Sequence, residues 1–203
     1  MYVFYISYIT KMSYIIRRGG ILKKIVKYLS VCLIVLFAAS GFVKAPLASA
    51  AEKNNDLIII NKQYNKLAYY HNGYLEMIEP VATGKSWEKT PVGFFKVVNK
   101  IKNRPYYTGH IPGGDPRNPL GKRWIGIDAN GTKGDTYAIH GNANESSIGK
   151  YVSQGCVRMH NDAVAKLFDK VKVGTPVTIT NSYRSFEELT KLYGYDFKGY
   201  NTK

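Results

Sequence analysis

Two Asn-Gly dipeptides, Asn72-Gly73 and Asn130-Gly131, interrupt short apolar runs and restrict the fold more than any other local pattern in this chain. Asn-Gly is typical of a type I′ turn, whose two central residues both need a positive φ. The flanking runs Leu67–His71 and Tyr74–Val81 therefore predict a β-hairpin. The remaining short apolar runs predict five further strands, at Leu57–Ile60, Phe94–Val98, Trp124–Ile127, Tyr137–Ile139 and Pro176–Thr180.

Helical spacing replaces the strand pattern after residue 160. Asn161 or Asp162 can cap a helix, and Gly174 ends the unit. Ser185-Phe186-Glu187-Glu188 is a capping box that predicts a short C-terminal helix. One apolar face of the first helix is formed by Ala163, Val164, Leu167, Phe168 and Val171. The residues alone thus predict a mostly antiparallel β domain with one internal and one terminal helix.

Residues 102–123 are dense in glycine, proline and asparagine and predict a long irregular loop. Loops of this length in compact domains are usually functional or disordered. The segment carries Tyr106, Tyr107 and Arg117, side chains that can contact a ligand. We therefore expect this loop to form a wall or lid of a cleft, with a disordered surface loop as the alternative.

The N-terminal 50 residues predict export. They contain no Asp or Glu, and the apolar run Leu29–Val43 ends before Ala48-Ser49-Ala50, a small-x-small cleavage site. A basic segment precedes the run, with Arg17, Arg18, Lys23, Lys24 and Lys27. We expect a signal peptide over 1–50, cut after Ala50; an uncleaved anchor is the alternative, although a run of about 15 residues is short for a membrane span. The expected location is the cell wall or the extracellular face of the membrane.

The chain left after cleavage is the size of one domain and is basic. Residues 51–56 form a polar lead-in. Seven of the 29 Lys and Arg residues fall in 1–50, so 22 remain against 14 acids, a net charge of +8. An exported protein rarely meets nucleic acid, so we expect no nucleic-acid partner. Anionic wall polymers or lipid headgroups fit the charge better, and a basic surface that only aids solubility is the alternative.

One cysteine, Cys156, remains outside the signal segment, and it cannot form an intramolecular disulfide. An unpaired thiol in an exported chain calls for a role other than cross-linking, and that of a Cys–His nucleophile is the leading one. His140 ends an apolar run and lies sixteen residues before Cys156. An imidazole there could take the thiol proton and return it to a leaving amine.

Glycines flank both residues, and an arginine follows the cysteine. Gly141 and Gly155 allow sharp turns and close approach of a substrate. We expect the Gly155 backbone N–H to contribute to an oxyanion hole. Arg158 could hold a substrate carboxylate, or it could pair with Asp162 and brace the loop.

Catalysis has two alternatives at these residues. A buried structural thiol is a common fate for cysteine, but the surroundings of Cys156 are polar and rich in glycine. A zinc site would have to collect His110, His140, Cys156 and His160, yet Cys-x3-His is not a typical structural spacing. We therefore expect no metal and take His160 as a capping or surface residue.

At these residues the chain resembles the L,D-transpeptidase (YkuD-like) catalytic domain. The resemblance rests on His140-Gly141, eleven intervening residues, and Ser153-x-Gly155-Cys156-Val157-Arg158-Met159. Thr90-Pro91-Val92-Gly93 and the strand Leu57–Ile60 also fit, so the likeness covers Leu57–Thr180. Gln154 departs from the pattern, since many members have histidine at that position.

The resemblance implies a fold and a chemistry. The fold would be mostly β, a single β-sandwich or mixed-sheet catalytic domain over 57–180, with one internal helix after the cysteine and a C-terminal helical extension over 181–203. Cys156 would attack the third residue of a peptidoglycan tetrapeptide stem, and His140, oriented by the Gly141 carbonyl, would carry the proton. Arg158, Ser153 and Tyr107 are expected to bind substrate. No cofactor is implied.

The acceptor of the acyl group stays open. A side-chain amine of a neighbouring stem would give a 3→3 cross-link, water would make the enzyme an L,D-carboxypeptidase, and a free D-amino acid would give exchange. A lipoprotein acceptor would give anchoring. A non-catalytic wall-binding module is the alternative of another class, and the intact Cys156 and His140 argue against it.

Overall fold

The computed structural model describes residues 55–200. The predicted signal segment 1–50 lies outside the described residues. Within residues 55–200 no helix is long and apolar enough to cross a membrane.

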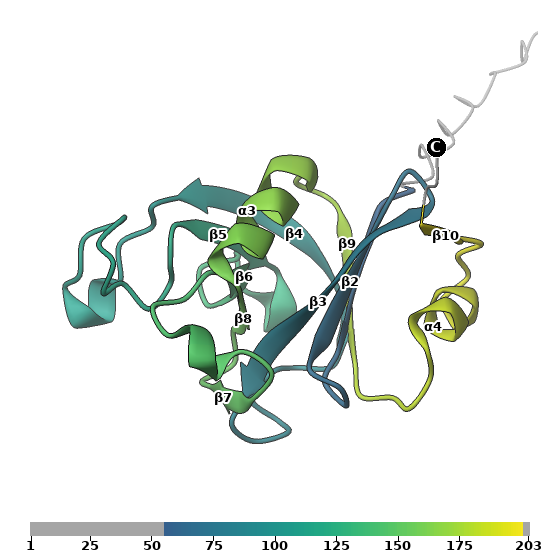
Figure 1. Ribbon diagram of the computed structural model, residues 1–203, viewed down its shortest axis with the longest axis horizontal. Coiled ribbons are helices and arrows are strands. Elements are labelled where there is room, and N and C mark those ends of the chain that lie inside the picture. Colours follow the sequence, from purple (N-terminus) through teal and green to yellow (C-terminus); the bar gives the residue numbers. More distant parts are fainter. Residues whose placement is uncertain (1–54, 201–203) are drawn as a thin grey trace, which may run out of the picture. The chain divides into compact units, whose positions relative to one another are not determined.

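A mixed sheet of ten strands forms the described part of the chain, in the order β10-β3-β2-β1-β9-β4-β5-β6-β8. β3 also pairs with β7 and with β8, and the β3–β8 pairing closes the path from β3 to β8 into a barrel-like sheet (Figure 1). The strands are β1 (Leu57–Asn61), β2 (Lys66–His71), β3 (Tyr74–Gly84), β4 (Gly93–Lys102), β5 (Arg123–Ile127), β6 (Tyr137–His140), β7 (Tyr151–Ser153), β8 (Val157–Met159), β9 (Pro176–Thr180) and β10 (Lys198–Tyr200). The expected mostly β fold is confirmed, with both parallel and antiparallel pairs.

β1 is a central strand of the sheet and is buried on both faces. It pairs antiparallel with β2 and parallel with β9, and all five of its residues are buried. Successive side chains of a strand point to opposite faces. Ile58 and Ile60 accordingly join the main core, whereas Leu57 and Ile59 join a second core with Leu189. A continuous apolar run is the sequence pattern that suits such a strand.

Two helices of residues 55–200 cover different sides of the sheet (Figure 1). α3 (Asn161–Lys170) packs on β5 and β6 and buries its predicted apolar face in the main core. α4 (Phe186–Leu192) lies on the other side of β1–β3, over the second core. The predicted capping box is present, since Ser185 and Glu188 exchange side-chain and backbone hydrogen bonds.

One predicted turn is confirmed, while a second turn and one helix start differ from the prediction. Asn72 and Gly73 have φ values of 51° and 83°, which confirms the hairpin between β2 and β3. Asn130 and Gly131 also have positive φ, but they lie in a 3-10 turn, η2 (Ala129–Gly131). The start of α3 differs as well: neither Asn161 nor Asp162 is the cap, because the helix begins at Asn161 and His160 precedes it without a side-chain cap bond.

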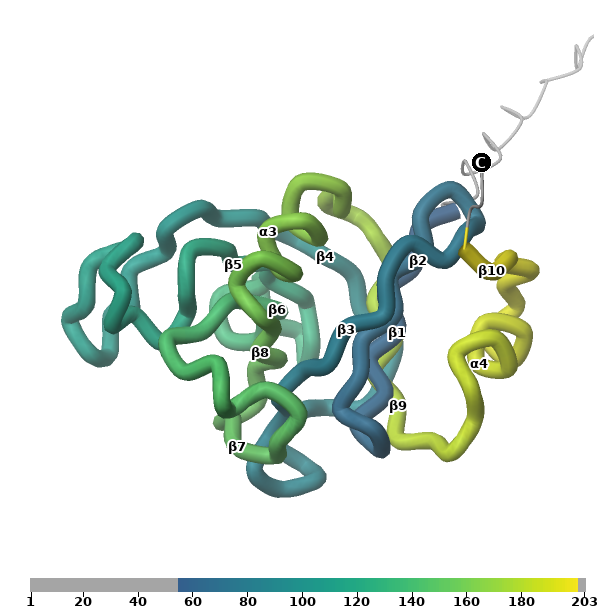
Figure 2. The backbone as a smooth tube through the Cα atoms, in the orientation of Figure 1, coloured from purple at the N-terminus to yellow at the C-terminus, as the bar shows by residue number. Residues whose placement is uncertain are grey.

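The irregular segment between β4 and β5 runs out beyond the two strands and returns (Figure 2). It contains a 3-10 turn, η1 (Tyr107–Gly109), and an isolated bridge between Tyr106 and Ile111. Asn118 holds it together, because its side-chain amide donates to the carbonyls of Arg104 and Pro112. The segment is therefore an ordered loop with its own hydrogen bonds.

Candidate active site

Two parallel strands bring the predicted catalytic residues together. β6 pairs with β8 so that Ile139 lies opposite Val157 and His140 opposite Arg158. Cys156 immediately precedes β8 and so lies at the end of this pair. The fifteen residues between His140 and Cys156 include η3 (Glu145–Ser147) and β7 and return the chain to the neighbouring strand.

A cavity of about 310 Å³ collects most of the expected site residues. Cys156, His140 and Arg158 all line it. The loop between β4 and β5 contributes three residues, which confirms the expectation that this loop forms a wall of the cleft. The lining residues are Tyr106, Pro119, Leu120, Thr136, Tyr137, His140, Ser153, Gln154, Cys156 and Arg158.

His140 is held in one orientation and kept neutral. Its side chain is 97% buried, and Nδ1 lies 2.6 Å from the Gly141 carbonyl oxygen. A carbonyl can only accept, so Nδ1 carries the proton and Nε2 keeps its lone pair. Burial lowers the pKa of His140 to about 4; the Gly141 and Leu120 carbonyls act against this shift, and the charges of Arg158 and Arg104 add to it.

Cys156 is half-buried and protonated in this environment. Burial raises the pKa of its thiol, and a backbone N–H of Ala138 and the charges of Arg104 and Arg158 only partly oppose this effect. The thiol donates to the Thr136 carbonyl oxygen at 3.2 Å. With His140 neutral and the thiol protonated, the resting pair is uncharged.

The turn before Cys156 is fixed by hydroxyl groups. Thr90 Oγ1 donates to the Gly155 carbonyl oxygen at 2.9 Å and accepts from the Gly84 N–H at 2.8 Å. Gly155 has a φ of +143°, and a Cβ there would lie 2.8 Å from the Lys89 carbonyl oxygen. Only glycine fits this position without displacing the backbone of residue 89.

Ser153 and Gly155 have other partners than the sequence suggested. The Ser153 hydroxyl donates to the Cys156 carbonyl oxygen at 2.6 Å and accepts from the Gly155 N–H at 3.1 Å. The Gly155 N–H, which was expected to donate to an oxyanion, is therefore already bonded inside the turn. Ser153, expected to bind substrate, lines the cavity but is only 1% exposed, and its hydroxyl braces the turn.

Arg158 reaches the cavity, and Tyr107 does not line it. No ion pair joins Arg158 to Asp162 among the ion pairs of residues 55–200, which removes the bracing alternative and leaves Arg158 as a cation in the cleft. Tyr107 is 68% exposed and is absent from the cavity lining, whereas its neighbour Tyr106 lines it.

Two residues of this region escaped sequence reasoning. Trp124 stacks on His140, with ring centroids 5.6 Å apart and planes 15° from parallel. The Arg104 guanidinium lies 4.1 Å from the centre of the Trp124 ring and adds a second positive charge that acts on His140 and Cys156. The cationic and aromatic run Arg104-Pro105-Tyr106-Tyr107 was the available signal for this contact.

His110 and His160, two of the four residues that a zinc site would need, do not line the cavity. Across residues 55–200 no group of three or more His, Cys, Asp or Glu could hold a metal ion. His160 forms an ion pair with Glu145.

The fold and the site together define a class, a barrel-like β domain with a thiol and a buried imidazole in one cleft. A model of the YkuD family, described as the L,D-transpeptidase catalytic domain, matches residues 55–179. The chain therefore belongs to the L,D-transpeptidase (YkuD) family and is an enzyme of this class.

Relatives agree with this membership, and a solved structure shares the fold. The chain is 49% identical over 144 residues to the putative L,D-transpeptidase YqjB of Bacillus subtilis, covering 71% of this chain and 82% of that one. It is 33% identical over 141 residues to the probable L,D-transpeptidase ErfK/SrfK of Escherichia coli, covering 60% and 43%. The solved Ldtfm-avibactam carbamoyl enzyme shares the fold, with a TM-score of 0.51, 24% identity and coverage of 64% and 50%.

Proposed function

We propose that this enzyme forms 3→3 cross-links between peptidoglycan tetrapeptide stems through an acyl-enzyme on Cys156. The observation that carries the proposal is the shared cavity of Cys156, His140 and Arg158, with His140 Nδ1 bound to the Gly141 carbonyl. That arrangement supplies a nucleophile, a proton carrier of defined tautomer and a cation for a carboxylate.

In the first step the donor stem loses its terminal residue. The Cys156 thiol gives its proton to His140 Nε2 as Sγ attacks the carbonyl carbon of the third residue, at its L-centre. The C–N bond to the terminal D-alanine then breaks, and the imidazolium returns the proton to the leaving amine. A thioester on Cys156 and free D-alanine result.

In the second step the acceptor restores the enzyme. The side-chain amine of a neighbouring stem attacks the thioester carbonyl and passes a proton to His140. The C–S bond breaks, Sγ takes that proton back, and an amide between the two third residues remains. The resting enzyme is regenerated without net oxidation or reduction.

The electrostatics favour proton transfer during the attack. Burial lowers the pKa of His140 to about 4 and raises that of the Cys156 thiol, so a thiolate–imidazolium pair is disfavoured before substrate binds. The imidazole is in its base form at neutral pH, which the first step requires.

The backbone N–H of Cys156 is better placed than that of Gly155 to donate a hydrogen bond to an oxyanion. The Gly155 N–H is bonded to Ser153, while the Gly155 carbonyl is anchored on Thr90. In a trans peptide the N–H points away from the carbonyl. The Cys156 N–H therefore points away from Thr90, and we assign it the oxyanion of the tetrahedral intermediate.

Substrate charge matches the cleft. Peptide stems carry carboxylates, and Arg158 in the cavity lining can hold one through two parallel hydrogen bonds. Arg104 lies close enough to affect both His140 and Cys156 and adds to the positive potential. Export through the predicted signal segment would bring this cleft to the wall, and the basic surface would favour anionic wall polymers.

The products of one incubation test the function. Disaccharide-tetrapeptide is incubated with the purified chain and analysed by mass spectrometry, with Cys156→Ala and His140→Ala in parallel. A cross-linked dimer with loss of D-alanine supports the proposal. Tripeptide alone would instead identify an L,D-carboxypeptidase, an exchanged stem in the presence of a D-amino acid would identify exchange, and binding without any product would identify a wall-binding module.

A further inference from the structure

One peptide group, between Gly141 and Asn142, connects His140 to a network of polar side chains. Its carbonyl oxygen, on Gly141, accepts from His140 Nδ1 at 2.6 Å. Its N–H, on Asn142, donates to Asn161 Oδ1 at 3.1 Å. Because the peptide group is planar, a hydrogen bond that fixes the N–H also fixes the direction of the carbonyl.

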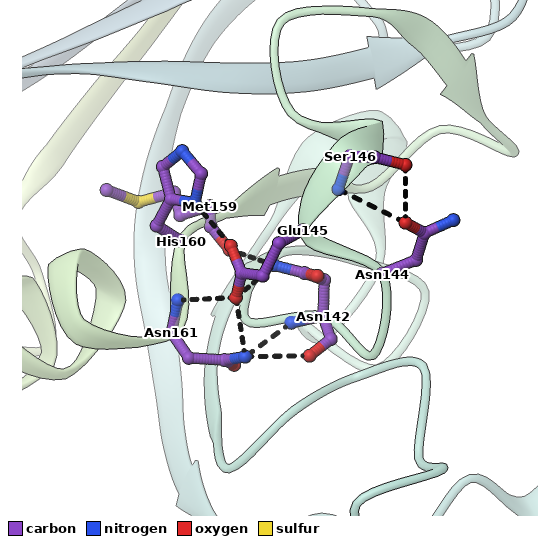
Figure 3. A network of polar contacts seen from close by, with 7 residues as sticks. All are labelled: Asn142, Asn144, Glu145, Ser146, Met159, His160 and Asn161. Carbon is purple, nitrogen blue, oxygen red and sulfur yellow. Dashed lines mark hydrogen bonds and ion pairs between the residues drawn. The ribbon is translucent and has the colours of Figure 1, made fainter.

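The side chain of Asn161 is itself fixed by two acceptors (Figure 3). Its Nδ2 donates to the Asn142 carbonyl oxygen at 2.8 Å and to Glu145 Oε1 at 2.9 Å. With both amide protons engaged in this way, Oδ1 faces the Asn142 N–H. Glu145 thereby determines which way the Asn161 amide points.

Glu145 holds further parts of the same network. Its Oε1 also accepts from Asn142 Nδ2 at 3.3 Å, and its Oε2 pairs with His160 Nδ1 (Figure 3). Asn142 Nδ2 donates in addition to the Met159 carbonyl oxygen at 2.7 Å. The loop after β6 is thus tied to the end of β8, to His160 and to the first residue of α3.

The contact between Asn161 and the Gly141 backbone leaves no spare room. A Cβ on Gly141 would lie 2.3 Å from Asn161 Oδ1, and a Cβ on Gly121 would lie 2.5 Å from the same atom. Both positions are glycine, so the Asn161 amide packs directly against the backbone that carries the Gly141 carbonyl. Displacing this amide would release the peptide group.

We infer that Asn161, oriented by Glu145, is a positioning residue for His140 that acts through the Gly141–Asn142 peptide. The inference rests on the proposed catalytic role of His140. The N–H bond to Asn161 polarises the peptide and strengthens its carbonyl as an acceptor. The network thus does through a peptide what a carboxylate or amide side chain does when it binds an imidazole directly.

The test uses substitutions that separate the hydrogen bond between Asn161 and the Asn142 N–H from the contact of Asn161 with Glu145. Glu145→Ala removes the acceptor that orients Asn161, and Glu145→Gln keeps a carbonyl oxygen in its place. Asn161→Ala removes the bond to the peptide itself. Asn144→Ala is the matched control, because Asn144 lies in the same loop but its side chain accepts only from Ser146 (Figure 3).

Kinetics and nuclear magnetic resonance are measured on the full chain. We expect Asn161→Ala and Glu145→Ala to lower kcat about 10- to 100-fold with KM within about threefold, since misplacing a reacting group costs rate more than affinity. Glu145→Gln and Asn144→Ala should stay within about threefold of the parent. In ¹⁵N-histidine spectra the parent His140 should show a protonated Nδ1, and the two alanine variants a mixture of tautomers.

The outcomes separate this inference from the proposed function. A retained Nδ1–H tautomer and an unchanged kcat in Glu145→Ala would overturn the inference, even if Asn161→Ala fails to fold. A lower melting temperature without a tautomer change would assign the network a structural role and would also overturn it. Failure of the cross-linking function would appear as an inactive parent chain, and the tautomer measurement would still decide the role of Asn161.

Discussion

The imidazole of His140 stacks on the indole of Trp124, with ring centroids 5.6 Å apart and planes 15° from parallel. The Gly141 carbonyl fixes the direction of Nδ1, and the indole restricts the tilt of the ring. Trp124 is itself fixed, because its Nε1–H donates to the Gly134 carbonyl oxygen at 2.8 Å. His140 is therefore held by an edge contact and a face contact.

Replacing the Trp124 indole should slow the acylation of Cys156. Trp124→Phe keeps an aromatic face beside His140, whereas Trp124→Leu removes it. We expect the rate constant of Cys156 acylation to fall about tenfold or more in Trp124→Leu and less in Trp124→Phe. The reason is that the imidazole, without the aromatic face, is no longer aligned with the thiol. The rate of D-alanine release from a tetrapeptide donor stem in a single turnover measures this acylation. Equal rates in the two variants, with equal melting temperatures, would show that stacking has no part in orientation.

Sequence reasoning predicted features whose cause is local. The Asn72-Gly73 turn follows from the φ preferences of two residues, and the capping box from hydrogen bonds within one turn of helix. Cys156 and His140 were found because an unpaired thiol and a glycine-flanked histidine, close in sequence, are typical of a nucleophile and its base. None of these inferences requires knowledge of distant contacts.

Features that depend on tertiary pairing were missed. β7, β8 and β10 have three residues each and pair with strands far away in sequence, so no local pattern marks them. The contact of Trp124 with His140 arises only after β5 and β6 pair, which places the two residues opposite each other. Short strands of this kind are stabilised by their partners.

Protonation of His140 should destabilise the fold in acid. Its pKa falls from 6.5 to about 4 on folding, so between these pH values the unfolded chain binds more protons. The stability present above pH 6.5 is lost as the pH falls to about 4, by about 3 kcal/mol at 1.36 kcal/mol per pKa unit. Urea unfolding at several pH values should show this loss in the parent and a smaller one in His140→Gln. Parallel curves for the two chains would contradict the assignment.

The resting thiol should react slowly with a simple alkylating agent. Burial raises the pKa of the Cys156 thiol, and the thiolate is the reactive form. Iodoacetamide labelling at Cys156, quantified by peptide mass spectrometry, should be slower than that of free cysteine at pH 7. Its rate should keep rising with pH after free cysteine has reached its plateau. A plateau near neutral pH would instead indicate a preformed thiolate–imidazolium pair.

The Thr90 hydroxyl should matter to the turn that carries the nucleophile. Thr90→Val keeps the shape of the side chain but leaves the Gly84 N–H and the Gly155 carbonyl without their partner. We expect a loss of about 1–3 kcal/mol in stability for the unpaired groups and a fall of about tenfold in the acylation rate. Thr90→Ser retains the hydroxyl and should lie near the parent in both measurements. Chemical denaturation and acylation kinetics are measured for both variants. If Thr90→Val matched Thr90→Ser in stability and acylation rate, the Thr90 hydroxyl would have no role in the turn.

Arg158 should contribute to substrate binding without the help of Asp162. The two residues form no ion pair within the part of the chain that the structure describes, and Arg158 lines the cavity. Arg158→Lys replaces a bidentate fork by a point charge, so KM for a tetrapeptide stem should rise while kcat changes little. Asp162→Ala is the matched control from the first turn of α3 and should leave KM unchanged. Steady-state kinetics with donor stems, with and without the terminal carboxylate, locate the contact: the Arg158→Lys effect should vanish for the amidated stem. If Asp162→Ala raised KM as much as Arg158→Lys, the two residues would act as one unit and the carboxylate contact would be wrong.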